Sequence, residues 1–263
     1  MIKTITSDTL KYLVASNIAI PHCFTTRLGG VSGDIFASLN LGMHRGDDPA
    51  NVAENYRILA NALGFDLDKL VMCQQTHSDT VHAVTEKDAL GIDHHIYPQR
   101  DAIITNTPGV ALWVFTADCT PVLLHDPVTG AVGAVHAGWR GTASQLAAKT
   151  VQAMVDTYGC KPENIHAAIG PNIGACCFET DRDVPDAMVR SYGDDALAFI
   201  SQKGHKYHLN LKELNALALK NAGVRSIEIS TDCTACLPDR YWSHRVTGGN
   251  RGSQGALILC KEV

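Results

Sequence analysis

The sequence has no long apolar run and no secretory leader. No stretch approaches the roughly 18 apolar residues of a membrane span. Residues 1–20 lack the basic start, apolar core and small-residue cleavage site of a signal peptide. These two absences argue against a transmembrane protein and against an exported one. We therefore predict a cytoplasmic protein without a membrane partner.

An excess of positive charge is also absent, as are repeats and low-complexity segments. The 22 Lys and Arg residues are outnumbered by 27 Asp and Glu residues, a balance that disfavours nucleic acid as a partner. Charged residues make up 19% of the chain and apolar residues 45%, which excludes intrinsic disorder. Because no linker divides the 263 residues, we predict a single domain over residues 1–263.

The His-x-His pairs that bind copper in multicopper oxidases are also absent. The chain has 12 His and 9 Cys residues, but none of the histidines forms the His-x-His pairs that a multicopper oxidase needs. His94 and His95 are adjacent instead, and we expect them in a solvated loop. Without an export signal, the odd number of cysteines predicts reduced thiols that are available as metal ligands or nucleophiles.

Hydrophobic periodicity predicts an α+β fold in which helices cover sheets. One helix should begin after Asp48, which can cap it, with Pro49 in its first turn, and should close at Gly64. Further helices are predicted at residues 143–158, 181–192 and 210–222. The predicted strands are LVMCQ, TVHAV, DAIIT, VALWVF, PVLLH and GAVGAVH, followed by residues 164–169, 226–230 and 256–260.

Three reactive side chains stand beside predicted strand ends, where a rigid scaffold can hold them at a cleft. His77 lies in the polar turn QQTHSDTV, Cys119 interrupts the apolar segment TADCTPVLL, and His136 ends the strand of AVHAGWRGT. Two imidazoles and one thiolate form a three-ligand zinc set that leaves the fourth position to water or substrate. These residues are the candidate metal ligands.

Other interpretations of the same side chains stay open at this point. Cys119 can be a buried thiol beside two hydrogen-bonded histidines, because free cysteine is commonly buried. It can also be the nucleophile of a cysteine hydrolase, with His136 as its base. Copper is a further alternative, since imidazole and thiolate ligands suit copper in an oxidase.

Taken together, these motifs resemble those of the bacterial laccase-domain proteins, also called polyphenol oxidase or YfiH-like proteins. The matching segments are FTTRLGGVS, SLNLG, QQTHSDTV, DAIIT, TADCTPVLL, AVHAGWRGT, IGPNIGACCFE and SHRVTGGNRG. They span nearly the whole chain from Pro21 onward, and VHAGWRG with ADCTP is the most specific part. The resemblance implies a β-sandwich of mixed sheets flanked by helices, in α/β/β/α layers. It also implies that His77, Cys119 and His136 bind zinc, with copper as the metal of the older polyphenol oxidase assignment.

The resemblance further implies a purine nucleoside phosphorylase that acts on adenosine, inosine and S-methyl-5'-thioadenosine, with adenosine deaminase activity. Its partners are then purine nucleosides and phosphate, and we expect a monomer or a small homo-oligomer. Arg27 and Arg140, each beside flexible glycines, are the candidates for binding phosphate. Asn40 and Gln75 are the candidates for binding the nucleoside, and Asp118 for moving a proton. Alternatively, Arg27 and Arg140 form structural ion pairs, and Asp118 only orients a ligand histidine.

Four other cysteines receive no role from the sequence. Cys176 and Cys177 are adjacent in IGPNIGACCFE, where two neighbouring thiols are not expected to bind one metal, and Glu179 is a weaker candidate for the pocket. Cys233 and Cys236 form a Cys-x-x-Cys pair, but no second pair follows at a zinc-ribbon spacing. We therefore predict that Cys176 and Cys177 are buried or line the pocket, and that Cys233 and Cys236 are structural thiols.

The C-terminal segment departs from the family pattern. A paired Arg-Arg after the serine is commoner than His244-Arg245, and the Gly-Arg element appears here as Asn250-Arg251. This departure argues against a role for the tail in the site.

Overall fold

Two six-stranded sheets form the centre of the computed structural model, which describes residues 1–92 and 100–262. The first sheet has the order β1-β2-β3-β15-β7-β4, with strands Lys3–Ser7, Leu10–Val14, His22–Thr25, Gln254–Leu259, Ala111–Thr116 and Leu70–Val71. The second has the order β14-β10-β8-β9-β6-β5, with strands Ser226–Ile229, His166–Ile169, Thr120–His125, Val132–Ala137, Ala102–Thr105 and Val81–Ala83. The expected loop position of His94 and His95 lies outside the described residues.

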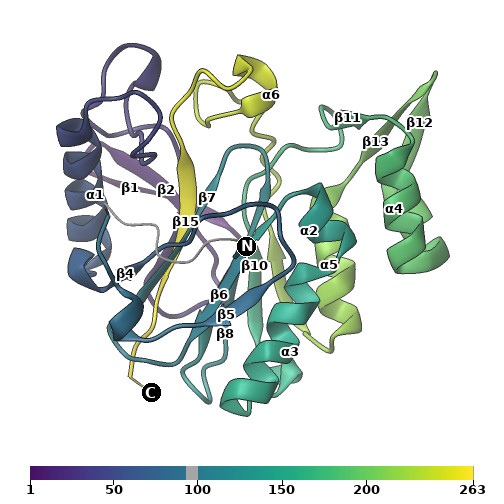
Figure 1. The fold of residues 1–263 in the computed structure, drawn as a ribbon, viewed down its shortest axis with the longest axis horizontal. Coiled ribbons are helices and arrows are strands. Elements are labelled where there is room, and N and C mark those ends of the chain that lie inside the picture. Colours follow the sequence, from purple (N-terminus) through teal and green to yellow (C-terminus); the bar gives the residue numbers. More distant parts are fainter. Residues whose placement is uncertain (93–99, 263) are drawn as a thin grey trace.

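Helices cover the outer faces of both sheets (Figure 1). Their bounds are Pro49–Leu63 for α1, Trp139–Ala143 for α2, Leu146–Tyr158 for α3, Asp183–Tyr192 for α4, Leu211–Asn221 for α5 and His244–Thr247 for α6. Helix α1 packs on the first sheet, whereas α3 and α5 pack on the second. The α+β class and its α/β/β/α layers are therefore confirmed. No described helix is both long and apolar enough to cross a membrane.

A smaller third sheet extends from one end of the sandwich. Its order is β11-β13-β12, with strands Glu179–Thr180, Lys206–Leu209 and Ile200–Lys203. Together with α4 it projects beyond the two large sheets in Figure 1. Neither this sheet nor the hairpin of β1 and β2 was predicted from the sequence.

Alternating side chains of each strand supply two different cores. In β6, Ile103 faces the core between the sheets, whereas Ile104 faces the core beneath α3. Successive strand residues point to opposite faces, so strands buried on both faces read as continuous apolar runs. Full burial of one such side chain contributes about 1.5–3 kcal/mol.

The predicted ends of α1 are confirmed, whereas the predicted start of the next helix is wrong. Asp48 accepts a hydrogen bond from Ala50 N at 2.9 Å, and Gly64 closes the helix with φ of 68°. The single helix predicted over residues 143–158 is two helices, α2 and α3. The chain breaks at Gln145, whose φ is 56° and whose amide donates to Ser191 O at 2.8 Å. A long-range contact therefore overrides the local periodicity.

The other helix predictions agree with α4 and α5. Asn210 caps α5 as expected, accepting from Glu213 N at 3.4 Å. The strand predicted for LVMCQ is shorter than expected and ends at Val71. Beyond Val71 the chain leaves the ladder, and the Gln75 side chain forms both hydrogen bonds with the backbone of Phe115, each at 2.7 Å.

Candidate active site

The candidate metal ligands line one large cavity at an edge of the sandwich. His77 lies in the segment between β4 and β5, Cys119 in the turn between β7 and β8, and His136 near the end of β9. The cavity has a volume of about 660 Å³, within the range of small-molecule sites. Three segments that are distant in sequence thus meet at one concave surface.

The ligand atoms of these three residues all lie within 4.8 Å of one another. Cys119 Sγ is 3.7 Å from His77 Nε2, and the imidazole centroids of His77 and His136 are 5.1 Å apart. A sulfur and a nitrogen that share a tetrahedral zinc ion are separated by about 3.6 Å. The donor set and its spacing therefore fit a zinc ion. His136 is buried, Cys119 is half-buried and His77 is exposed, so the group is open towards the cavity.

Unusual backbone geometry brings the ligands this close. His77 and Asp118 have φ values of 61° and 88°, a left-handed conformation that costs non-glycine residues of order 1–3 kcal/mol. At Gly138, a Cβ atom would lie 2.7 Å from His77 Cδ2 and 3.2 Å from Cys119 Sγ. Gly138, between His136 and α2, therefore leaves the space that the side chains of His77 and Cys119 occupy.

A carboxylate that the sequence analysis missed, Asp101, holds two of the ligands. His136 Nδ1 donates to Asp101 Oδ1 at 2.7 Å, and the His77 peptide N–H donates to the same oxygen at 3.1 Å. Asp101 Oδ2 accepts from the peptide N–H groups of Thr76 and Ser78 at 3.1 and 2.6 Å. The first bond occupies Nδ1 of His136 and leaves Nε2 for a metal, as carboxylate–histidine pairs do at zinc sites.

The sequence does contain a signal for Asp101. It directly precedes the apolar strand of DAIIT, and its solvent exposure is 0%. A buried carboxylate requires a charged or hydrogen-bonding partner, so an acidic residue at the start of a buried strand is itself a candidate.

The ligand group favours a thiolate beside an imidazolium when no metal is bound. Burial acts to raise the pKa of Cys119, but the charges and hydrogen bonds of His136 and His77 lower it to about 6. Burial acts to lower the pKa of His136, but the Cys119 thiolate and Asp101 raise it to about 9. The pKa of Asp101 is about 2 despite its burial, because His136 and Ser78 stabilise the ionised form. The negative charge of Cys119 and Asp101 suits a cation at this position.

Asp118 has a different role from the one expected. Its Oδ1 accepts from Thr234 Oγ1 at 2.6 Å, and its Oδ2 accepts from Ser243 Oγ at 3.1 Å and from Arg245 N at 2.7 Å. The carboxylate neither contacts a ligand histidine nor has an oxygen left without a partner. Asp118 lines the cavity but fastens the C-terminal segment to the turn that carries Cys119.

Arg27 and Asn40 do not line the cavity, which corrects their predicted roles. The Arg27 guanidinium donates to the carbonyls of Ala37 and Pro238, and its Cζ lies 3.8 Å from the centre of the Trp242 ring. Nearby carbonyl groups and the Trp242 ring therefore occupy the Arg27 guanidinium, which we had expected to bind phosphate.

The fully buried Asn40 likewise has a structural role. Its Oδ1 accepts from the peptide N–H groups of Gly42 and Ser253, each at 2.9 Å, and both of those residues line the cavity. Gln75 does line the cavity, but its amide is bonded to the backbone of Phe115. Both amides position the cavity wall and have little capacity left for a nucleoside.

Arginines from several segments line the cavity, and Arg140 is one of them. Its Cζ lies 4.2 Å from the centre of the Trp139 ring, and it forms no ion pair within the described residues. The same wall contains Arg45, which the sequence analysis did not name, and Arg251 of the C-terminal segment. The expectation that the tail has no role in the site is therefore wrong.

Arg251 is the most deeply placed of these cations. It is 8% exposed, its Nη1 donates to Gly252 O at 2.8 Å, and its Nε has no hydrogen-bond partner among the described residues. Burial and the charge of Arg45 lower its pKa to about 10, although Asp118 and Cys119 act in the opposite direction. A buried guanidinium beside a second cation is characteristic of a site that receives an anion.

The four cysteines without an expected role do meet in the structure, outside the cavity lining. The ligand atoms of Cys176, Cys177, Cys233 and Cys236 lie within 4.8 Å of one another. The prediction that Cys233 and Cys236 lack a partner pair is therefore wrong. Glu179 also lies outside the cavity lining, with Oε2 3.6 Å from His208 Nε2.

Comparison with known proteins agrees with the resemblance seen in the motifs. A family model described as multi-copper polyphenol oxidoreductase laccase matches residues 21–261. The chain therefore belongs to this laccase-like family.

The individual relatives are named as purine nucleoside phosphorylases, whereas the family model is described as a laccase. A protein of Deinococcus radiodurans named purine nucleoside phosphorylase is 41% identical over 96% of this chain and 94% of its own length. Purine nucleoside phosphorylase YfiH of Shigella flexneri is 39% identical over 86% of this chain and 88% of its own. The crystal structure of YlmD from Geobacillus stearothermophilus superposes with a TM-score of 0.91 at 35% identity, covering 98% of this chain and 99% of that one.

Proposed function

We propose that this chain is a zinc-dependent purine nucleoside phosphorylase that also deaminates adenosine. The observation that carries the proposal is the pairing, in one cavity, of the His77–Cys119–His136 group with the buried Arg251 guanidinium. The names of the relatives support the same reaction class. Adenosine, inosine and S-methyl-5'-thioadenosine are the substrates we assign to it.

The metal would be held by His77, Cys119 and His136, which offer three protein ligands and leave a position open. When bound, zinc supplies Lewis acidity and lowers the pKa of a coordinated water to about 7. Asp101 orients His136 through the 2.7 Å bond to Nδ1 and fixes the turn of His77 through its peptide N–H. Deamination at the purine C6 draws on this group.

Aromatic side chains offer a place for the purine. Phe115, Trp139 and Phe178 line the same cavity as the ligand group. Flat aromatic surfaces stack on a purine without a requirement for a particular hydrogen-bonding pattern, which agrees with the acceptance of more than one purine nucleoside.

The cationic wall suits phosphate, the second substrate. Phosphorolysis joins a phosphate oxygen to C1 of the ribose, breaks the bond between C1 and the purine nitrogen, and returns a proton to the departing base. Arg251 and Arg45 would hold the phosphate, with Arg140 closing on it from the start of α2. Because Arg251 is buried, its charge is screened little by solvent and favours the anion strongly.

We also infer that residues 1–263 form one catalytic domain, because the core between the sheets contains both Leu13 and Ile258. The cysteines of the described residues are free thiols, which suits the reducing cytoplasm as the place of action. A monomer or small homo-oligomer agrees with a site built wholly from one chain.

Product analysis of adenosine incubated with purified, metal-assayed protein, with and without phosphate, tests the proposed function. We expect adenine only when phosphate is present, and inosine in both conditions. Stoichiometric copper with dioxygen consumption and no nucleoside turnover would instead identify a polyphenol oxidase. Full hydrolase activity of metal-free protein, with covalent trapping at Cys119, would identify a cysteine hydrolase.

A further inference from the structure

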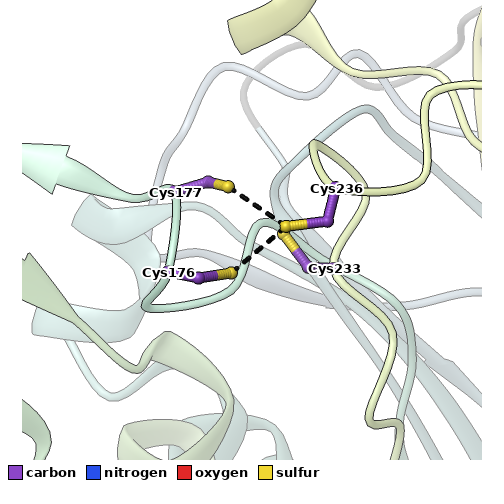
Figure 2. Close-up of side chains that lie close together, drawn as sticks. All are labelled: Cys176, Cys177, Cys233 and Cys236. Atoms are coloured by element: carbon purple, nitrogen blue, oxygen red, sulfur yellow. Dashed lines mark hydrogen bonds between the residues drawn. The ribbon is translucent and has the colours of Figure 1, made fainter.

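Four cysteine side chains from two separate loops point towards one another beside the cavity wall (Figure 2). Cys236 Sγ is 3.5 Å from Cys176 Sγ and 3.3 Å from Cys177 Sγ. The ligand atoms of all four, Cys233 included, lie within 4.8 Å of one another. None of the four is in a disulfide bond. This group is called the four-thiol cluster below.

The sheet topology explains why these distant residues meet. Strands β10 and β14 are parallel neighbours, so the loops that follow them leave the sheet at the same edge. The two loops continue the pairing for a few residues, since Ser230 N donates to Ile169 O at 2.8 Å and Thr234 N donates to Asn172 O at 3.0 Å. Cys176 and Cys177 follow on the first loop, and Cys233 and Cys236 on the second.

We propose that the four-thiol cluster binds a structural zinc ion, separate from the metal of the cavity. Sulfurs that share a tetrahedral zinc ion are separated by about 3.8 Å when each Zn–S bond is about 2.3 Å. The separations of 3.5 and 3.3 Å from Cys236 Sγ are slightly shorter than this value, and the remaining ones stay within 4.8 Å. Four protein sulfurs and no open position are the ligand set of structural rather than catalytic zinc.

The surroundings of the cluster are those of a metal thiolate. Gly174 N donates to Cys233 Sγ at 3.2 Å, and hydrogen bonds to sulfur stabilise metal-bound thiolates. A Cβ atom at Gly174 would lie 3.2 Å from both Cys176 Sγ and Cys233 Cβ. Lys212 is 6% exposed, donates to Asp232 O at 2.8 Å and interacts with the charges of Cys233 and Cys176. A buried ammonium beside four thiols offsets the negative charge of a zinc tetrathiolate.

The ion would join two loops that meet the cavity wall, since Phe178 of the first lines the cavity and Thr234 of the second donates to Asp118 Oδ1 at 2.6 Å. Arg245 Nη1 donates to Cys177 O at 2.8 Å, and its peptide N–H donates to Asp118 Oδ2 at 2.7 Å. Phe178, the next residue after Cys177, lines the cavity. Zinc in the four-thiol cluster therefore fixes the wall that carries Phe178 and Arg245, without contact to the reacting groups.

Zinc content of protein purified under reducing conditions tests the assignment. We expect about two zinc ions per chain in the wild type and about one in the Cys233→Ser/Cys236→Ser variant. His77→Ala should also retain about one, because its loss concerns the cavity metal alone. Cys160→Ser/Cys260→Ser is the matched control: it removes two buried thiols elsewhere and should leave the wild-type content.

Wild-type protein gives an independent test that does not depend on the folding of a variant. Peptides that contain the four cysteines should resist alkylation until a chelator removes the metal, and cobalt in their place should give the visible absorption of a tetrathiolate site. A single zinc that is lost on His77→Ala, with all four thiols alkylated at once, would overturn the proposal. A mass lower by two hydrogens, which marks a disulfide in the cluster, would overturn it as well. Each result is read without any nucleoside assay, so it stands apart from the proposed function.

Discussion

The cavity group and the four-thiol cluster use cysteine in contrasting surroundings. Cys119 lies between two strands of the buried sandwich, with two imidazoles beside it, whereas the four thiols lie on loops that leave the sheet edge. Asp101 fixes the cavity ligands from behind, whereas a glycine N–H and the Lys212 ammonium accompany the cluster. The first group faces a cavity of about 660 Å³, and the second does not line it.

This difference separates two kinds of metal chemistry. An open ligand set that is held rigidly can activate a bound molecule, whereas a closed set of four protein ligands can only stabilise the chain that provides it. The ligand sets agree with this division. The two imidazoles and one thiolate of the cavity would leave a fourth position on a metal open, whereas the four sulfurs of the cluster would complete a tetrahedral shell. The following tests address the contrast in order of decreasing effect.

Replacement of Cys119 by alanine should abolish phosphorolysis and deamination while the fold remains intact. The variant removes one of the three proposed metal ligands of the cavity but leaves the four-thiol cluster unchanged. Activity assays, circular dichroism and zinc analysis together check this outcome, with Cys160→Ser as the control. Deamination with full zinc content in the Cys119 variant would remove Cys119 from the ligand set.

Asp101→Asn should weaken metal binding at the cavity by about 10–100-fold, because the amide cannot supply the charge that orients His136. Titration with zinc in competition with a chromophoric chelator measures the loss of affinity. Two binding transitions are expected, and the tighter one, which we assign to the four-thiol cluster, should stay unchanged. Asp118→Asn is the matched control, since the Asp118 carboxylate accepts hydrogen bonds from Thr234, Ser243 and Arg245 and from no ligand histidine among the described residues. Equal effects of the two changes would argue against a special role for Asp101.

Arg251→Ala should raise the KM for phosphate by about 10-fold or more, since a charge-assisted hydrogen bond contributes about 1.5–3 kcal/mol. Deamination, which uses no phosphate, should change much less. Steady-state assays of both reactions separate the two effects. Arg27→Ala is the control: it should lower stability without a selective effect on phosphate, because its guanidinium bonds to Ala37 and Pro238.

In metal-free protein, alkylation of Cys119 should be about tenfold slower at pH 5 than at pH 7, because its pKa is about 6 and only the thiolate reacts. Burial and the neighbouring Cys236 raise the pKa of Cys176 and of Cys177. Both should therefore react appreciably only at higher pH. Quantitative mass spectrometry of alkylated peptides measures the profiles, and identical profiles at the two groups would contradict this difference.

Gly174→Ala should weaken zinc binding by the four-thiol cluster and have the smallest effect of the four substitutions. The new methyl group would lie 3.2 Å from Cys176 Sγ, a contact that a shift of a few tenths of an ångström relieves. Competition with a chelator should show the weaker transition, whereas cavity zinc and nucleoside turnover should match the wild type. Gly159→Ala serves as the comparison for a change remote from the cluster. Its backbone strain comes from a φ of 68°, and no atom lies within 4 Å of the added methyl group.

Local patterns were sufficient for much of the fold. Asp48 and Gly64 marked the ends of α1 because capping depends on neighbouring residues alone. The apolar runs of β6, β8 and β9 marked strands buried on both faces. The break at Gln145 was missed because it depends on Ser191, a partner 46 positions away.

Part of the site was predictable from residue types, and part was not. The residue types of His77, Cys119 and His136 nominated them as candidate ligands, but the choice between a metal site, a buried thiol and a nucleophile came only with the family resemblance. Arg27 and Asn40 looked equally suitable, yet backbone carbonyls and peptide N–H groups occupy them. Nothing local distinguishes a free guanidinium from an occupied one.

The sequence by itself determined the class of fold, the ends of the principal helix and the three candidate metal ligands. Only the tertiary structure placed Asp101 behind His136, brought Arg251 into the cavity wall and joined Cys176 and Cys177 to Cys233 and Cys236. The physical reason is that periodicity and capping act within a few residues. A ligand set, by contrast, forms between segments whose proximity depends on which strands pair. The parallel pairing of β10 with β14 cannot be predicted from the residues of either strand alone.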